Sequence, residues 1–251
     1  MAYQANSVNG FPLGTFYFPN VSFPKVWQAA INTGDTDLYT CPSGRRAIIL
    51  ACYFTNNSGV GNIVAYVEAK ISSVYYRLSA NATITNGTIN NTANPQPFIL
   101  EAGQGFSINS TTNNGLTAGL RVIEFDNSSP LKTVSLLSLS AGNNTLYTVP
   151  TGKTALLLSS TGSSQPSLPG FQFGFVFYGN TSTVNRTVSM NAVPSGGSVG
   201  GSNLILASTT VANNNFSSPT IQFNLFDGDF INVNTDANTA TQIAWVNVYE
   251  F

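Results

Sequence analysis

Histidine is absent from this 251-residue chain. Imidazole is the commonest general base and metal ligand near neutral pH, so Ser-His-Asp triads, Cys-His pairs and His-containing zinc sites are excluded. Two cysteines are too few for a structural zinc site. No glycine cluster is followed by the Lys-Ser/Thr of a phosphate-binding loop. We therefore expect a protein that is not an enzyme, with no catalytic residues, no cofactor and no metal.

Charge is also scarce, because only 8% of the residues are Asp, Glu, Lys or Arg, against about 25% in an ordinary soluble domain. The nine basic and ten acidic residues are scattered along the chain. No basic stripe is available for phosphates or anionic lipids, so neither nucleic acid nor a membrane is an expected partner. Asn, Ser, Thr and Gly supply the polarity instead. A surface of amides and hydroxyls has little self-repulsion and suits molecules that assemble.

Long apolar runs are missing as well. No window approaches the roughly 18 apolar residues of a membrane span, and the amino terminus lacks the basic and apolar regions of a secretory signal. The two cysteines, Cys41 and Cys52, would lie far apart on strands that pair across the turn at 42–44. We expect two small buried hydrophobic residues and no disulfide.

What the sequence does contain is an internal repeat. Residues 38–50 match residues 146–158 without gaps, at an offset of 108 (146 minus 38), and both begin Leu-Tyr-Thr-x-Pro-x-Gly-Lys/Arg. Both repeats close on Glu-Phe, at Glu124 and at Glu250. The second is longer, and we expect most of the difference in a flexible Gly- and Ser-rich loop at 194–202.

Short runs of β-branched and aromatic residues, punctuated by Asn, Gly, Ser and Pro, predict strands and hardly any helix. Several strands per repeat of about 100 residues are typical of a sandwich or jelly roll. The sequence thus predicts an all-β fold of two tandem, sequence-related β-sandwich (jelly-roll-like) domains, at 31–126 and 127–251. Residues 1–30 carry three prolines and alternate aromatic with small residues. We expect an extended N-terminal arm there, with a strand of the first sandwich as the alternative.

Paired carboxylates are the catalytic arrangement still open to a histidine-free protein. Asp35 and Asp37 correspond to Asn143 and Thr145 in the second repeat, so we interpret them as turn residues. Asp227 and Asp229 flank Gly228 between two apolar runs, and a β-turn explains them better than a calcium loop.

Glu124 and Glu250 recur at the end of each repeat, which indicates a structural role in the final strand. Sequons of the Asn-x-Ser/Thr type are interpreted as turn residues or possible glycosylation sites; they include Asn20, Asn56, Asn81, Asn86 and Asn185.

The repeat, with its Leu-Tyr-Thr-x-Pro-x-Gly-Lys/Arg start and its Gly-containing turn before Phe-x-Ile/Val-Asn, resembles β-sandwich virion structural proteins of phages. Capsid cement, decoration and head-knob proteins use this pattern. The resemblance implies a location in the virion and binding to capsid or other virion proteins. It also implies a homo-oligomer, with a trimer favoured.

Two alternatives stay open. The first is a major coat protein with two jelly rolls in one chain. The second is a tail-associated receptor- or carbohydrate-binding module, in which exposed Trp27, Trp245 or the pair Tyr75-Tyr76 would stack on sugars. Burial in the fold is the simpler explanation for both tryptophans.

Overall fold

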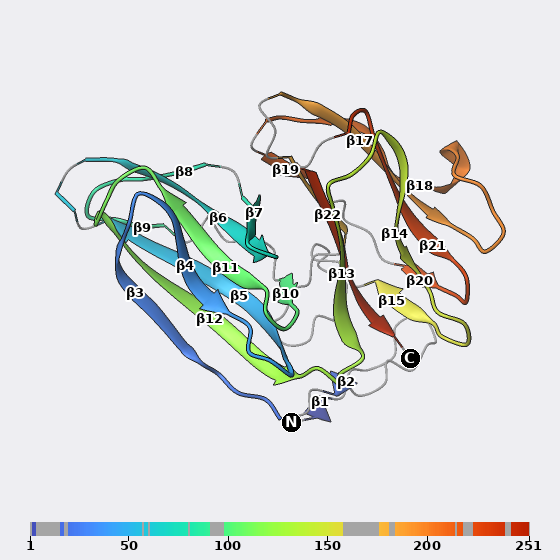
Figure 1. Cartoon of the computed structure of the whole chain (residues 1–251), viewed down its shortest axis with the longest axis horizontal. Coiled ribbons are helices and arrows are strands. Elements are labelled where there is room, and N and C mark those ends of the chain that lie inside the picture. The colour runs from blue at the N-terminus through green and yellow to red at the C-terminus, as the bar shows by residue number, and fades with distance from the viewer. Residues whose placement is uncertain are drawn as a thin grey trace. The chain divides into compact units, whose positions relative to one another are not determined.

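A computed structural model gives the structure of the chain and describes residues 2–3, 16–17, 20–56, 58–59, 61–79, 81–90, 98–157, 176–180, 184–213, 215–217, 223–238 and 242–250. The described residues form two compact units, unit 1 up to Ser129 and unit 2 from Pro130 onward (Figure 1). The regular structure in these ranges is strand, apart from the 3-10 turn η1 (Gly201–Asn203). This confirms the predicted all-β fold.

Unit 1 is a sandwich of two antiparallel sheets. The first sheet has the order β3-β12-β5, and the two short strands β9 and β10 both pair with β5. The second has the order β4-β11-β6, and β7 and β8 both pair with β6. The bounds are β3 Lys25–Ile31, β4 Gly34–Thr40, β5 Arg45–Asn56, β6 Ile63–Ile71, β7 Val74–Arg77, β8 Ala82–Ile84, β9 Ile89–Asn90, β10 Phe98–Leu100, β11 Gly105–Ser110 and β12 Leu116–Asp126. Most successive strands cross to the other sheet, which is the jelly-roll connection.

Unit 2 repeats this order. In its first sheet, β22 pairs with β13 along one edge and with β15 and β16 along the other. The outermost strands are β20, which pairs with β15, and β19, which pairs with β16. The second sheet has the order β14-β21-β17-β18. The bounds are β13 Leu131–Leu137, β14 Gly142–Thr148, β15 Ala155–Leu157, β16 Val176–Asn180, β17 Arg186–Val193, β18 Leu204–Val211, β19 Asn215–Ser217, β20 Phe223–Leu225, β21 Phe230–Thr235 and β22 Gln242–Glu250. The single long strand β5 of unit 1 thus corresponds to two shorter strands, β15 and β16. The chain is two tandem jelly rolls of one topology, as predicted.

Alternation along the strands explains the cores. In β6 the buried face carries Ile63, Ala65, Val67, Ala69 and Ile71, because successive side chains of a strand point to opposite faces. The largest fully buried side chains of unit 1 are aromatic, namely Phe54, Phe106 and Phe125. The core of unit 2 is mostly aliphatic and includes Val188, Met190, Ile231, Val233 and Val246.

The segment predicted as an N-terminal arm is partly strand. Residues 25–31 form β3, which pairs with β12, and Ser22 already bridges to Glu124 of that strand. This end of the segment therefore belongs to the first sandwich, the alternative that the sequence left open. Nearer the amino terminus, β1 (Ala2–Tyr3) pairs with β2 (Phe16–Tyr17), and residues 4–15 lie outside the described ranges.

The register between the units shows where the second repeat is longer. Ala47 and Ala155 pair with equivalent glutamates of β12 and β22, at an offset of 108 (155 minus 47). Asn56 and Asn180, at the far ends of β5 and β16, already differ by 124 (180 minus 56). Most of the extra length thus falls between β15 and β16, not at 194–202 as expected. The stretch 194–202 does lengthen one connection, since unit 1 has only Ser72 and Ser73 there.

Candidate functional site

The two glutamates that close the repeats make the same contact in both units. The Tyr39 hydroxyl donates to Glu124 Oε1 at 2.8 Å, and the Tyr147 hydroxyl donates to Glu250 Oε1 at 2.7 Å. Tyr39 lies on the second sheet and Glu124 on the first, so the bond joins the two sheets of the sandwich. We call these two pairs the Tyr–Glu clamps.

A cation completes each clamp, although it comes from a different place. Arg45 Nε lies 3.9 Å from Glu124 Oε2, and Lys132 Nζ lies 2.5 Å from Glu250 Oε1. Burial, reinforced by the hydrogen bond to the glutamate, raises the pKa of both tyrosines far above its usual value. The tyrosines therefore act as hydroxyl donors. The clamps hold the two sheets of each unit together, which is the kind of structural role that the recurrence of the glutamates predicted.

Asp227 and Asp229 bind backbone amides. Asp227 accepts from Gly152 N at 2.9 Å, and Asp229 accepts from Ser195 N and Phe226 N, each at 2.8 Å. Gly228 between them has φ +77°, a value that favours glycine. These contacts are those of a tight turn. Among the described residues, no group of three acidic, histidine or cysteine side chains could hold a metal ion.

The cysteines and one of the sequons are buried. Cys41 and Cys52 are not joined by a disulfide, and burial raises the pKa of the Cys41 thiol to about 12, so neither resembles a reactive thiol. The Asn56 side chain is fully buried and donates to Gly61 O and Ile84 O. It holds the fold together and offers no acceptor for a glycan.

Of the aromatic residues singled out for sugar stacking, Trp245 and Tyr76 are buried, at 5% and 3% exposure. The side chain of Trp27 lies outside the described residues. Tyr75 is half-buried and lies on the face of its sheet that points away from the core, because it alternates with Tyr76 along β7. Of the three candidates whose side chains are described, Tyr75 is the accessible one.

That outer face of the second sheet of unit 1 gathers charge. The side chains that alternate with the buried ones on β4, β6 and β7 are largely ionisable, and one row of paired positions crosses the four strands β4, β11, β6 and β7. The row is Asp37, Ser107, Glu68 and Arg77. Asp35 and Lys70 flank it, through pairs with Asn109 and with Gly105 and Tyr75. We call Asp35, Asp37, Glu68, Lys70 and Arg77 the charged face of unit 1.

Asp37 is the best-satisfied member of the charged face. Its carboxylate accepts from Ser107 Oγ at 2.7 Å and from the Tyr75 hydroxyl at 3.1 Å, and it pairs with Lys70 Nζ. Partial burial works against ionisation, but the bonds from Lys70, Ser107 and Tyr75 outweigh it and hold the pKa of Asp37 below its usual value. Asp37 is therefore a fixed anion at neutral pH.

Glu68 is the opposite case. It is 6% exposed, and none of the residues that the structure describes donates to its Oε2. Burial, with a hydrogen bond to the Asp35 carboxyl that exists only while Glu68 is protonated, raises the pKa of Glu68 to about 8. Glu68 is thus a carboxylic acid at neutral pH with an unfilled acceptor.

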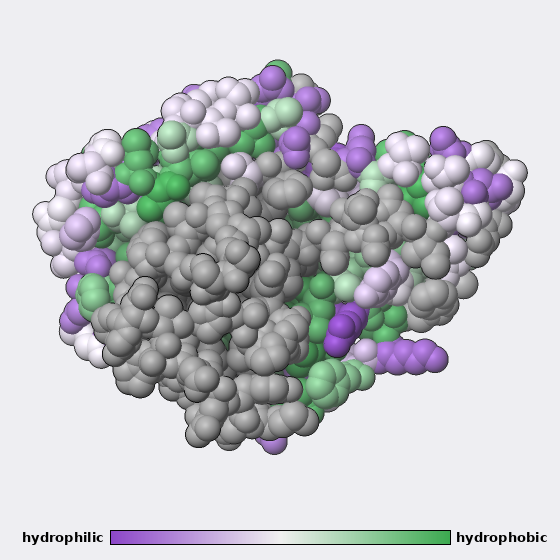
Figure 2. Space-filling model, turned by 180° about the vertical axis from the view of Figure 1, so that it is seen from behind, coloured by the Kyte–Doolittle hydropathy of each residue, from purple (hydrophilic) through white to green (hydrophobic). Residues whose placement is uncertain are grey.

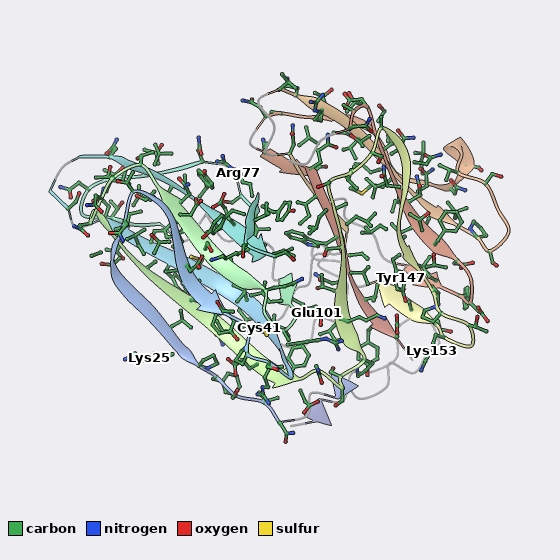
Figure 3. All side chains as sticks on the ribbon, viewed as in Figure 1. Lys25, Cys41, Arg77, Glu101, Tyr147 and Lys153 are labelled. Atoms are coloured by element: carbon green, nitrogen blue, oxygen red, sulfur yellow. The ribbon has the colours of Figure 1, made fainter. Side chains whose placement is uncertain are left out.

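Arg77, which is labelled in Figure 3, is paired with Glu68 across the strands. Its guanidinium lies 3.6 Å from the centre of the Tyr66 ring. Its Nε donates to Ser79 O at 2.7 Å, and its Nη2 donates to Asn81. A guanidinium on an aromatic face is favourable by roughly 0.5–2 kcal/mol. These contacts fix the orientation of the arginine over β6 and leave it beside Glu68.

The equivalent face of unit 2 is uncharged. The row there is Thr145, Asn232, Asn191 and Leu204, flanked by Asn143 and Val193. The connection at 194–203 folds over it: the Asn191 amide donates to Gly200 O and to Asn203 Oδ1, each at 2.8 Å. Val193, at the position of Lys70, is fully buried. In unit 2 the connection at 194–203 covers this face, whereas in unit 1 the same face carries charged side chains.

The interpretation of Asp35 and Asp37 as turn residues is wrong, because both lie in β4 and pair with β11. Sequence reasoning also named Tyr75, but it missed Glu68, Lys70 and Arg77. Their signal was present, since Tyr66, Glu68 and Lys70 alternate with apolar residues in one strand. Only the pairing of β6 with β7 and β11 shows that residues from three segments share one face.

No family model matches the chain, and no curated protein matches it. Among solved structures it is similar to the N-terminal CBM22-1–CBM22-2 tandem domain of Paenibacillus barcinonensis Xyn10C, at 10% identity over 92% of this chain and 91% of that one, with a TM-score of 0.28. It is similar to the STIV MCP, at 9% identity over 91% and 96%, with a TM-score of 0.31. A third, described as the triple jelly roll fold and turret assembly in an archaeal virus, shows 13% identity over 92% of this chain and 59% of that one, with a TM-score of 0.25.

Proposed function

We propose that this chain is a virion structural protein, a coat subunit that carries two jelly rolls in one chain and assembles with copies of itself. The observation that carries the proposal is the duplication: two complete jelly rolls share one strand order and one Tyr–Glu clamp. Two similar units in one chain give each subunit two sets of related surfaces, which suits a lattice in which neighbours meet at quasi-equivalent positions.

The surface supports the same role. Among the residues coloured in Figure 2, many are pale, the colour of side chains near zero hydropathy, and they are mixed with purple and green ones. With only 8% charged residues, copies of the chain repel one another weakly and can approach closely. In the described part of the chain, no helix is long and apolar enough to cross a membrane. We place the protein in the virion, with other virion proteins as its partners.

The test is assembly of the purified chain, followed by size-exclusion chromatography with light scattering and by negative-stain electron microscopy across a concentration series. A coat subunit forms shells, sheets or arrays by itself, with a trimer as the expected building block. Because few charges are involved, assembly should change little between about 0.05 and 0.5 M salt.

Two other results are informative. A discrete oligomer that forms no lattice but sediments with pre-formed capsids would make it a capsid cement or decoration protein. A monomer at every concentration that ignores capsids would rule out both roles.

A further inference from the structure

The charged face of unit 1 stands out because charge is rare in this chain. The sequence has nine basic and ten acidic residues, and five of them lie on this one sheet face. Buried or half-buried charged groups cost free energy, and an apolar or amide surface would suffice to cover a sheet. Unit 2 does so at the equivalent positions with asparagine, threonine, valine and leucine. The charges are therefore not a requirement of the jelly roll.

The charges on the face balance one another. Lys70 pairs with Asp37, and Arg77 lies beside Glu68 with its guanidinium on the Tyr66 ring. With two cations, two aspartates and a protonated glutamate, the face has no net charge with which to attract a phosphate or another ion. What it offers is a dense set of fixed hydrogen-bonding groups, which suits a neutral ligand rich in hydroxyls.

Part of that hydrogen-bonding capacity is unused. Oε2 of Glu68 receives no donor from the described residues, but it is buried too deeply for a ligand to reach. Asp35 is exposed, and its carboxylate accepts from Asn109 Nδ2 at 2.5 Å and from the protonated Glu68 carboxyl. A carboxylate can accept several hydrogen bonds, so the exposed Asp35 can take a further donor from a ligand. A sugar hydroxyl is a donor of that kind.

An aromatic ring lies next to these groups. Tyr75 is half-buried, Lys70 Nζ lies 5.2 Å from its ring centre, and its hydroxyl is tied to Asp37. The ring is thus held in place before any ligand arrives. A fixed tyrosine ring can pack against the C–H face of a pyranose while neighbouring polar groups bind its hydroxyls.

We infer that the charged face of unit 1 is a binding site for a neutral saccharide, with Tyr75 as the stacking ring and with Asp35 as a hydroxyl acceptor. Unit 2 has no such site, because the chain itself covers the equivalent face through Gly200 and Asn203. This binding is separate from assembly and is measured on the isolated chain, so its failure and the failure of the coat-protein proposal are distinguishable.

The experiment is isothermal titration calorimetry, which measures the dissociation constant of the full chain for each of four neutral hexasaccharides: cellohexaose, maltohexaose, mannohexaose and xylohexaose. A heparin hexasaccharide is the charged comparison. We expect at least one neutral hexasaccharide to bind. Tyr75→Ala and Asp35→Ala should each weaken that binding by about tenfold or more. The matched control is Asn143→Ala, at the position in unit 2 equivalent to Asp35, and should bind as the wild type does. Thermal unfolding of each variant shows that it is folded.

Three results would overturn the inference. The first is that no neutral hexasaccharide binds, or that heparin binds more tightly than all of them. The second is that Tyr75→Ala and Asp35→Ala bind the saccharide as the wild type does. The third is that these two variants lose self-assembly while saccharide binding is absent throughout, which would make the face a contact between subunits.

Discussion

The two units of this protein treat one sheet face in opposite ways. Both have the same strand order and the same Tyr–Glu clamp. Both also have a positive-φ glycine in an equivalent turn, Gly44 before β5 and Gly152 before β15. On the outer face of the second sheet, however, unit 1 carries charged side chains, whereas unit 2 carries amides under a loop. The shared features are those that a jelly roll needs to close, and the face that differs is free to acquire a function.

Glu68 and Asn191 show what the difference means energetically. They occupy equivalent positions and are both buried. The Asn191 amide donates to both Gly200 and Asn203, whereas one oxygen of Glu68 receives no donor from the described part of the chain. The buried amide of Asn191 does not titrate, so its contribution to stability does not depend on pH. The buried carboxyl of Glu68 is uncharged only below its pKa, and its ionisation at higher pH is unfavourable in a buried site.

The largest expected effect is therefore a pH dependence that comes from unit 1. The pKa of Glu68 is about 8 in the folded chain, raised from 4.5. At pH values between these two, the folded state therefore binds more protons than the unfolded state. The free energy of unfolding should fall as the pH rises from about 5 to about 8, by on the order of a few kcal/mol, and then level off. Urea denaturation at a series of pH values measures this directly, and with no histidine in the chain the background in this interval is low.

Two variants test the assignment to Glu68. Glu68→Gln should remove most of the slope, because glutamine is neutral throughout. Asn191→Asp should create a slope of the same sign in unit 2, where the equivalent position has none. If Glu68→Gln keeps the slope of the wild type, another group is responsible and the comparison between the two faces fails.

The sequence predicted the parts of this comparison that local chemistry determines. The repeat at residues 38–50 and 146–158, the closing glutamates and the strand runs sufficed for two tandem sandwiches. The clamps required knowledge that Tyr39 and Glu124 face each other across two sheets, which no spacing in the chain reveals. The charged face was hidden for the same reason, since Asp37, Glu68 and Arg77 become neighbours only through the register of four strands.

An intermediate effect should come from the clamps, and it should be the same in both units. Tyr39→Phe and Tyr147→Phe each remove a hydrogen bond to a partly buried carboxylate, which costs about 1–3 kcal/mol of unfolding free energy. The two losses should add in the double variant, because the clamps share no partner. Tyr53→Phe, on an exposed side chain of β5, is the control and should change stability by less than about 0.5 kcal/mol. A loss in only one unit would show that the clamps are not equivalent.

The smallest expected effect concerns the loop that closes the face of unit 2. Asn203 Oδ1 accepts from Asn191 Nδ2 and from Gly200 N, and its Nδ2 donates to Ser198 O. Asn203→Ala should therefore cost only about 1 kcal/mol but should speed amide hydrogen exchange across 194–203, while the turn at 72–73 in unit 1 keeps its rate. Ser198→Ala leaves the backbone acceptor in place and should exchange like the wild type. Unchanged exchange in Asn203→Ala would mean that other contacts hold the loop over β17, and that the side chain of Asn191 is satisfied without it.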